Sequence, residues 1–494
     1  HTALAETTTF AQLMDPGVFP EPQWGMVVES VQQRDGNVIV RTTGARIELD
    51  CEKGEIRFDQ RISHERTVAI LRIGRPLGNP TLTHNVPGFT RITFEEPAMT
   101  LRINGDSLFM LQVHEPLTIS VDRRIAAAWH SSHLTSHLIA DEWGAFGLYC
   151  SEETLEDAFD AYAKTVARYP LPKDAVLCVG VCPPKPYDWA RSLTDNVLWH
   201  WSNVRGYPSD KELRSWEGLS NIVLLQSEVM LWKDWNLAFV PRLGDEEFAR
   251  VRKTIHDMDM RLIVYTSPFL FLKDTPHENL AFNSWEDIKA PAIPSCPGRG
   301  ENMETFLGEV RRVMRDYKPD GLYFDGQYFL NPAALYALAR RSREIVGEDG
   351  ILEWHSSAAL GYAQCYFPQA DAYIDFILRG EALSGVSFDY LRYFVSGYNI
   401  SNCNGVLCNA ITMPLTPELA KNVLAANARL HTSVNTFKNE AHDPALATIL
   451  QQEYKAKLTP ELRQRVDAGV DARQAKTEKK AAMRQQADEA LRKS

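Results

Sequence analysis

The sequence predicts an α/β protein in which an N-terminal antiparallel β-sandwich precedes a (β/α)8 barrel of the TIM type. Short alternating segments recur from residue 20 to 150, with turn residues at the spacing that is typical of a sandwich. After residue 176, apolar strands alternate with amphipathic helices, which is typical of a parallel α/β architecture. We therefore expect four regions: a sandwich over 1–150, a linker helix over 151–175, a catalytic barrel over 176–440, and a helical, charged C-terminal region over 441–494.

The sandwich strands are expected where apolar and polar residues alternate with period two. They cover residues 36–43, 45–49, 55–58, 67–73, 89–94, 99–103, 117–121 and 144–150. Ser151 and the acidic residues after it have the composition of a helix N-terminus. We expect that helix to continue to about Tyr169 and to end at Pro170.

The barrel strands are expected to be short, apolar and separated by helices. Seven are placed, at residues 196–202, 221–226, 261–267, 321–324, 350–354, 373–378 and 405–408. The eighth is not placed, and residues 176–181 are an alternative first strand. Amphipathic helices are expected over residues 245–258, 304–317 and 332–346.

The composition is that of a globular protein with an acidic balance. The 494 residues carry a net charge of −11, which argues against nucleic acid as the main partner. No apolar run reaches the ~20 residues that a membrane helix needs. No signal-peptide pattern opens the chain, yet His1 in place of Met indicates a processed or trimmed N-terminus. We therefore expect an extracellular or periplasmic location.

The eight cysteines are scattered and include no CxxC pair, so no zinc site is expected. Cys178 with Cys182, and Cys403 with Cys408, are close enough in sequence to be parts of disulfides. We favour buried free thiols at these positions.

The strongest functional signal is the segment Asp320-Gly-Leu-Tyr-Phe-Asp-Gly-Gln327. Its apolar part reads as a buried strand that ends at Asp325. Active-site residues of (β/α)8 barrels lie at the C-terminal ends of the strands, so Asp325 is a candidate catalytic carboxylate, and Gln327 would reach the same cleft. The alternative is that Asp325 caps the following loop.

A second carboxylate is expected from the sixth strand. Glycoside hydrolysis needs one ionised carboxylate and one that is kept protonated, and we assign these roles to Asp325 and Glu381. Asp375 is the alternative acid/base, and Arg379 supplies a nearby positive charge. The structural alternatives are a salt bridge between Glu381 and Arg379 and a buried ion pair at Asp375.

The fifth strand carries Glu353 and His355, whose spacing places both on one face. If that face is the barrel lumen, His355 would donate a hydrogen bond to a hydroxyl or a carboxylate. The alternative is a histidine that is satisfied within the core.

Aromatic residues near strand ends are candidate sugar platforms, because the C–H faces of pyranose rings stack on flat rings. An acid between two tryptophans would hydrogen-bond vicinal hydroxyls. The alternative is packing of these side chains in the barrel. The candidates are Trp199, Trp201, Trp232, Asp234, Trp235 and Tyr265.

These features together resemble the retaining α-glycosidases of the (β/α)8-barrel superfamily, such as the α-galactosidase and α-N-acetylgalactosaminidase families. The resemblance covers about residues 20–410 in architecture, but only short motifs in sequence. It implies that Asp325 is the nucleophile of a double displacement and that the acid/base is Glu381 or Asp375. The chain departs from the family pattern where Leu322 to Phe324 precede the nucleophile without a lysine, and where Gln226 begins the loop after the second strand.

Two other functions remain open from the sequence. A divalent metal-dependent sugar isomerase or epimerase would use Asp325, Glu353, His355 and Asp375 as ligands. A non-catalytic carbohydrate-binding protein would keep the cleft and lack the second carboxylate. The glycosidase hypothesis requires no cofactor and predicts an oligosaccharide or polysaccharide substrate.

Overall fold

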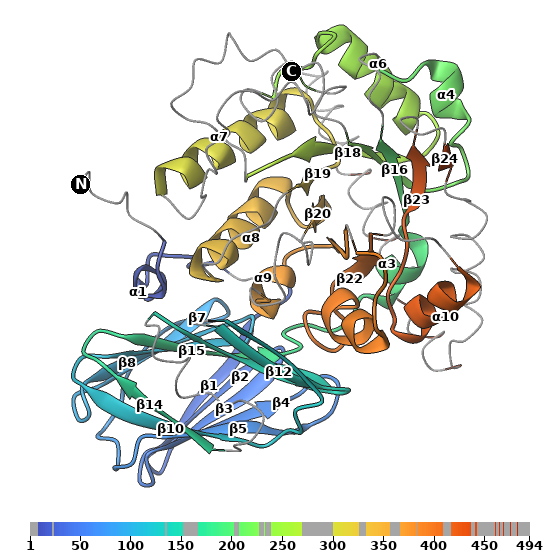
Figure 1. The fold of residues 1–494 in the computed structure, drawn as a ribbon. Coiled ribbons are helices and arrows are strands. Elements are labelled where there is room, and N and C mark those ends of the chain that lie inside the picture. The colour runs from blue at the N-terminus through green and yellow to red at the C-terminus, as the bar shows by residue number, and fades with distance from the viewer. Residues whose placement is uncertain are drawn as a thin grey trace, which may run out of the picture.

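The computed structural model describes residues 8–21, 24–133, 136–151, 166–201, 207–226, 232, 239–268, 300–325, 332–355, 366–381, 383–408, 416–435, 440–441 and a few isolated residues beyond 459. These residues form two bodies, an antiparallel sandwich and a barrel of parallel strands (Figure 1). The predicted fold class is therefore confirmed. The expected helix of the C-terminal region falls almost entirely outside the described residues.

Two antiparallel sheets form the sandwich. The first has the order β1 (Val28–Arg34), β2 (Asn37–Thr42), β3 (Ala45–Asp50), β4 (Glu55–Gln60), β5 (Arg66–Arg72), β10 (Leu117–Arg123) and β14 (Val166–Leu171). The second has the order β11 (Trp129–His133), β12 (Ser136–Asp141), β13 (Gly144–Cys150), β15 (Val176–Cys182), β9 (Leu108–Val113), β8 (Met99–Asn104), β7 (Phe89–Phe94) and β6 (Thr81–Asn85).

The two sheets differ in how many of their faces are buried. Strand β3 alternates strictly between buried and half-buried residues, because only one face of its sheet meets the sandwich core. Strand β9 is almost wholly buried: Phe109 and Leu111 pack in the sandwich core, whereas Leu108 and Met110 pack in the core of the barrel. The second sheet thus lies between two cores.

The strands of the sandwich continue to Cys182, which differs from the expected boundary at residue 150. Residues 166–171, predicted as the end of a linker helix, form β14 and pair with β10. Residues 176–181, the alternative first barrel strand, belong to β15 and pair with β9 and β13. The start of the predicted helix, over 152–165, lies outside the described residues. Pairing with strands of the sandwich that are distant in sequence decides the structure of both segments.

The barrel has eight parallel strands among the described residues. They are β16 (Val197–Trp201), β17 (Ile222–Gln226), β18 (Arg261–Thr266), β19 (Gly321–Phe324), β20 (Ile351–His355), β21 (Phe376–Arg379), β22 (Asn404–Leu407) and β23 (Thr432–Asn435). Strand β23 pairs with β16, and it is the eighth strand that the sequence did not place. A parallel bridge between Val406 and Arg429, just before β23, closes the ring. Strand β24 (Glu440–Ala441) adds an antiparallel edge to β23.

Helices surround the barrel and connect its strands. They are α3 (Trp189–Thr194), α4 (Asp210–Arg214), α6 (Asp245–His256), α7 (Gly300–Asp316), α8 (Pro332–Val346), α9 (Pro368–Asp371), the π-helix η4 (Tyr390–Val395) and α10 (Pro417–Ala425), with α1 (Phe10–Leu13) at the N-terminus. The three helices that the sequence predicted correspond to α6, α7 and α8.

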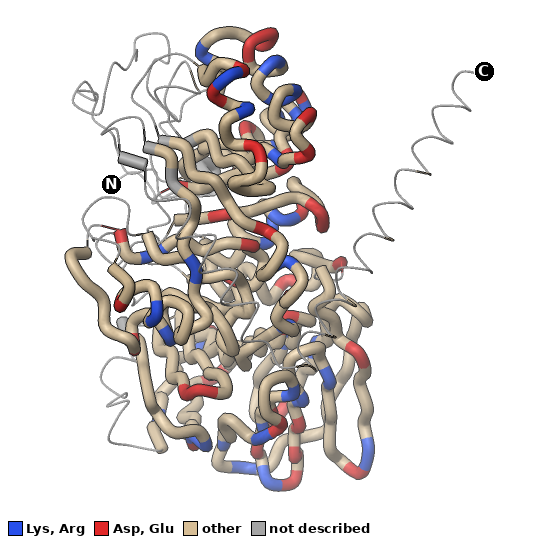
Figure 2. The backbone as a smooth tube through the Cα atoms, turned by 90° about the vertical axis from the view of Figure 1, so that its right-hand side faces the viewer, with Lys and Arg blue, Asp and Glu red and all other residues tan. Residues whose placement is uncertain are grey.

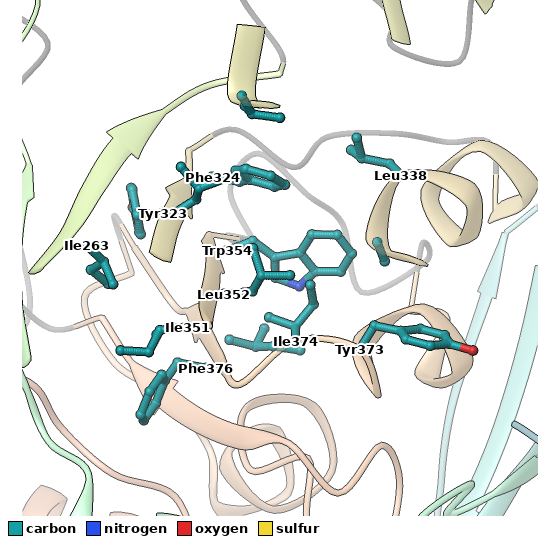
Figure 3. Packing of buried hydrophobic residues seen from close by; sticks show 14 of the residues in the cluster. Ile263, Tyr323, Phe324, Leu338, Ile351, Leu352, Trp354, Tyr373, Ile374 and Phe376 are labelled. Carbon is teal, nitrogen blue, oxygen red and sulfur yellow. The ribbon is translucent and has the colours of Figure 1, made fainter. Parts of the chain in front are cut away.

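The barrel strands are buried on both faces, which explains their continuous apolar sequences. Phe324 of β19 and Trp354 of β20 point outward to α8, where Leu338 lies, whereas Ile351 and Phe376 lie on the opposite side of the strands (Figure 3). Residues one position away from Phe324 and Trp354 along each strand therefore face the lumen.

A buried carboxylate joins the sandwich to the barrel. Asp106, in the turn between β8 and β9, accepts hydrogen bonds from the hydroxyls of Tyr336 at 2.5 Å and Tyr373 at 2.7 Å. Both tyrosines belong to the barrel, on α8 and just after α9. Arg340 of α8 donates to the Tyr373 hydroxyl at 3.2 Å. The contact fixes α8 and the segment after α9 in position on the second sheet.

The remaining features concern charge and cysteine. Acidic and basic residues are interspersed along the described chain (Figure 2). Of the described helices, none combines the length and apolarity needed to cross a bilayer. Within the described part, Cys51, Cys178, Cys182, Cys403 and Cys408 are free and buried, and Cys150 is buried as well. This agrees with the buried free thiols expected at Cys178, Cys182, Cys403 and Cys408.

Candidate active site

Three neighbouring strands bring Asp325, His355 and Glu381 together at the C-terminal rim of the barrel. Asp325 follows the last residue of β19, and His355 is the last residue of β20. Strands β19, β20 and β21 pair in parallel, so they end at one level. Glu381 follows β21 after Gly380, whose φ of 97° lies in a region that glycine adopts readily.

The imidazole of His355 lies between the two carboxylates. Its Nδ1 is 3.0 Å from Oδ1 of Asp325, and its Nε2 is 3.3 Å from Oε2 of Glu381. The His355 side chain is only 4% exposed, whereas those of Asp325 and Glu381 are 19% and 22% exposed. The histidine is therefore held below two carboxylates that reach solvent.

Two tyrosines complete the contacts of Asp325 and His355. The Tyr265 hydroxyl donates to Oδ2 of Asp325 at 2.8 Å, so Tyr265 lies beside the candidate carboxylate. The Tyr323 hydroxyl lies 3.0 Å from Nδ1 of His355. Because Asp325 has a contact at each oxygen, its carboxylate is fixed in orientation.

Opposing effects set the charge of His355. Burial alone would lower its pKa, but the hydrogen bond to Asp325, a contact with Cys408, and the charges of Glu381 and Asp325 raise the pKa well above the ordinary value. Charged neighbours outweigh desolvation here because both carboxylates are within direct contact. The two carboxylates therefore favour the protonated, cationic form of the imidazole.

Glu381 is shifted toward its protonated form. Burial raises its pKa, the His355 cation lowers it, and the negative charge of Asp325 raises it, with a net rise. A carboxyl with a raised pKa beside an ionised carboxylate is the arrangement that glycoside hydrolysis uses for its general acid. The chemistry available at this rim is thus proton donation by Glu381 and nucleophilic or base action by Asp325.

Glu353 faces the lumen as expected, but it lies one layer below the rim. Its side chain is fully buried, and Oε1 is 2.7 Å from Nε2 of His431. His431 lies just before β23 and contacts the ring of Phe376. The pair fills the lumen under the rim, so Glu353 supports the site from below.

Asp375 and Arg379 take structural roles, contrary to their assignment as site residues. Asp375 precedes β21, at the N-terminal end of the barrel, where it is paired with Arg191 and with Arg343, the latter at 2.7 Å. Burial would raise its pKa, but the two arginines lower it strongly, so it cannot serve as a proton donor. The structural alternative for Asp375 is the correct one.

Arg379 does not pair with Glu381. It points away from the lumen and forms a buried ion pair with Asp371 at 2.8 Å. Its guanidinium also lies 4.3 Å from the ring centroids of Tyr366 and Phe394. An arginine that is 2% exposed and enclosed in this way holds α9 and η4 against β21.

Two of the predicted aromatic platforms, Trp232 and Trp199, are buried. Trp232 is completely buried, and its indole donates to the Tyr265 carbonyl at 2.6 Å, so it packs in the core and is no sugar platform. Trp199 is 6% exposed and belongs to the barrel core. The side chain of Trp201 and all of Asp234, Trp235 and Gln327 lie outside the described residues.

Sequence reasoning missed three residues that surround the site. Tyr323 belongs to the segment from Asp320 to Gln327. It lies two positions before Asp325, so the alternation of strand side chains could have placed it on the same face. His431 and Cys408 come from the last two strands, which the sequence placed poorly or not at all. Within the described part of the chain, no group of three or more His, Cys, Asp or Glu residues has the arrangement of a metal site.

Comparison with known proteins gives likeness in structure alone. No family model and no curated protein sequence matches the chain. A GH36 alpha-galactosidase from Geobacillus stearothermophilus is 8% identical over 85% of this chain and 86% of its own, with a TM-score of 0.42. A GH31 dextranase from Flavobacterium johnsoniae is 11% identical over 91% and 71%, with a TM-score of 0.40. A chitinase from Bacteroides thetaiotaomicron is 10% identical over 53% and 98%, with a TM-score of 0.34.

Proposed function

We propose that this protein is a glycoside hydrolase that cleaves an α-linked glycan with two carboxylates. The observation that carries the proposal is the contact of His355 with both Asp325 and Glu381 at the C-terminal rim. In this proposal Asp325 acts in its ionised form, and Glu381 gives a proton to the leaving oxygen. The raised pKa of Glu381 supports its role as the acid.

The stereochemical course has two candidates. The resemblance to α-galactosidase-type enzymes implies retention, with Asp325 as nucleophile and carboxyls about 5–5.5 Å apart. The imidazole between the two carboxylates favours a wider separation, about 6.5–9.5 Å, in which Asp325 would activate a water and invert the anomeric centre. Proton NMR of the first-formed anomer distinguishes the two: an α-product supports retention, and a β-product supports inversion.

The metal-dependent isomerase hypothesis loses its ligand set. Asp375 lies at the opposite end of the barrel from Asp325, and Glu353 is paired with His431. The non-catalytic hypothesis expects that the second carboxylate is missing. In the structure, Glu381 is present and contacts His355, which in turn contacts Asp325. Both observations favour the hydrolase.

Hydrolysis of aryl α-glycosides tests the function directly. The panel contains α-galactoside, α-N-acetylgalactosaminide and α-glucoside, with EDTA present. We expect one sugar to be released, and we expect Asp325→Asn and Glu381→Gln to lose about 10²–10⁴-fold in kcat. Asp375→Asn is the matched control, because it removes a carboxylate far from the rim. Full activity in Asp325→Asn, or activity that EDTA abolishes, would contradict the proposal.

A further inference from the structure

An aromatic pair stands exposed on the sandwich, away from the barrel rim. Trp143 lies in the turn between β12 and β13, and His64 lies in the loop between β4 and β5, so the two come from different sheets. Their ring centroids are 5.4 Å apart and their planes are tilted by 33°. Trp143 remains 44% exposed, and His64 is also exposed. The pair forms a small aromatic surface in contact with water.

The backbone that carries Trp143 is fixed from several sides. Its N–H donates to Oδ1 of Asp141 at 2.9 Å, and its carbonyl accepts from Nε2 of Gln60 at 2.5 Å. Arg66 holds Asp141 with two hydrogen bonds of 2.6 and 2.7 Å. A large ring on a fixed backbone loses little conformational freedom when a ligand covers it.

The barrel holds the same turn from the other side. The Glu142 carbonyl accepts from Nη2 of Arg392 at 2.7 Å and from Nδ2 of Asn399 at 3.0 Å. Oδ1 of Asn399 also accepts from Ser63, beside His64, at 2.7 Å. Arg392 belongs to η4, which follows β21, so the aromatic pair has a fixed position relative to the barrel.

A second aromatic pair adjoins the same hairpin. Trp129 of β11 lies opposite Ala140 of β12, immediately before Asp141, and its ring stacks on Tyr393 of η4 with centroids 6.1 Å apart and planes 12° apart. Both rings are half-buried. Ring faces from the sandwich and from the barrel thus border one polar hairpin.

We propose that Trp143 and His64 form a carbohydrate-binding platform that holds a glycan chain outside the barrel rim. The rings would stack against pyranose C–H faces, and the fixed Arg66–Asp141 pair and the exposed Glu142 would hydrogen-bond ring hydroxyls. This site goes beyond the proposed hydrolytic centre, although the choice of a glycan rests on the proposed function.

The chemistry of the surface favours a glycan over other partners. A stable protein interface buries about 1,200–2,000 Å², far more than two rings offer. Glu65 and Glu142 beside the rings are exposed acids, which disfavour an anionic membrane surface. A neutral, hydroxyl-rich ligand can bind to a small surface and is not repelled by the exposed acids.

Native gel electrophoresis through polysaccharides tests the platform. The gels contain dextran, soluble starch or galactomannan, and the protein carries Asp325→Asn so that no substrate is consumed. We expect at least one polymer to retard this protein, and Trp143→Ala to weaken that binding about tenfold, because the variant loses the larger ring of the platform. Trp143→Phe should keep part of the affinity.

Trp24→Ala is the matched control, because Trp24 is 38% exposed but lies in the N-terminal segment. Unchanged migration of Trp143→Ala, equal losses in Trp24→Ala, or no retardation by any of the three polymers would overturn the platform. The measurement reports binding alone, so its failure differs from a failure of hydrolysis. Trp143→Ala in the active protein should leave aryl glycoside hydrolysis unchanged.

Discussion

His355 is the residue that connects the two candidate catalytic groups. It contacts Asp325 through one ring nitrogen and lies beside Glu381 at the other. The carboxylates face solvent more than the histidine does, so in the proposed reaction a substrate would meet the acids and the histidine would act through them. His355 is in this sense a positioning residue that also supplies charge.

Replacing His355 with glutamine should change the pH dependence of the reaction. The cation lowers the pKa of Glu381, so its loss should raise that pKa and extend activity to higher pH. We expect kcat to fall by about 10–10²-fold because the orientation of both carboxylates is lost. The pH profile of kcat checks this, and a basic limb that stays in place in the variant would show that Glu381 is not the acid.

Tyr265 tests the contribution of a single hydrogen bond to Asp325. The substitution Tyr265→Phe removes the hydroxyl that donates to Asp325 and leaves the ring in place. A hydrogen bond to a charged group contributes about 1.5–3 kcal/mol, so kcat should fall by about one to two orders of magnitude. Steady-state kinetics measure the change, and Trp232→Phe, which alters the indole behind Tyr265, serves as the control with near-normal kcat.

At the scale of elements, β21 shows how one strand separates structure from chemistry. Asp375 precedes it and Glu381 follows it, so only four strand residues and a glycine lie between an ion pair at one end of the barrel and the rim at the other. Because Asp375 and Glu381 are close in sequence, the sequence alone leaves either of them as a candidate acid/base. The direction of the strand assigns them to different ends.

Asp375→Asn should destabilise the barrel without touching the chemistry. The change leaves the buried charge of Arg343 without its carboxylate and leaves Arg191 with Asp195 alone, and breaking a buried pair costs about 3–5 kcal/mol. Urea unfolding should show the loss, while kcat of the folded variant stays near the wild-type value. A large drop in kcat with unchanged stability would return Asp375 to the active site.

The lowered pKa of Asp375 predicts how the stability of the folded protein changes with pH. A carboxyl whose pKa falls on folding stabilises the folded state above its unfolded pKa and loses this contribution as the pH falls toward the folded value. The wild-type protein should therefore lose stability in acid more steeply than Asp375→Asn does. Unfolding curves between pH 7 and pH 3 measure the difference.

At the scale of the whole molecule, the second sheet of the sandwich faces the barrel (Figure 1), and residues of both bodies pack in one core. The second sheet contributes residues to both cores, and Asp106 joins it to Tyr336 and Tyr373. Burial raises the pKa of Asp106 despite these hydrogen bonds. The two bodies are thus expected to unfold together.

Replacing Asp106 with alanine should weaken this junction. The hydroxyls of Tyr336 and Tyr373 would lose their acceptor, at a cost of about 1–3 kcal/mol each, and calorimetry should show a lower Tm or two separate transitions. Asp106→Asn is the control, because it keeps an acceptor. A single transition with an unchanged Tm in the alanine variant would mean that apolar packing alone joins the two bodies.

The same junction has a pH dependence of opposite sign to that of Asp375. A carboxyl whose pKa rises on folding contributes stability that is fully present below its unfolded pKa and is lost as the pH rises through the folded value. Wild-type stability should therefore fall relative to Asp106→Asn as the pH rises. Parallel unfolding curves for the two proteins provide the measurement.

The sequence by itself determined the elements that depend on local pattern. Period-two alternation located strands such as β3, where one face meets solvent, and continuous apolar runs located β17 to β20. Asp325 was identified because a buried strand ends immediately before it, and His355 because it shares a strand face with Glu353. These inferences need only the residues near each position in the chain.

The tertiary structure decided what depends on distant partners. Strands β9 and β12 are buried on both faces, so their sequences carry no alternation to reveal them. Strand β15 is also buried on both faces; its apolar sequence indicates a strand but not that it belongs to the sandwich. Strand β23 became the eighth barrel strand by pairing with β16, across most of the barrel sequence. Asp375, Arg379 and Trp232 received structural roles from ion pairs and packing partners that lie far away along the chain. Contacts between residues that are remote in sequence therefore decide which candidate residues lie at the rim and which lie in the core. The local sequence pattern does not encode these contacts.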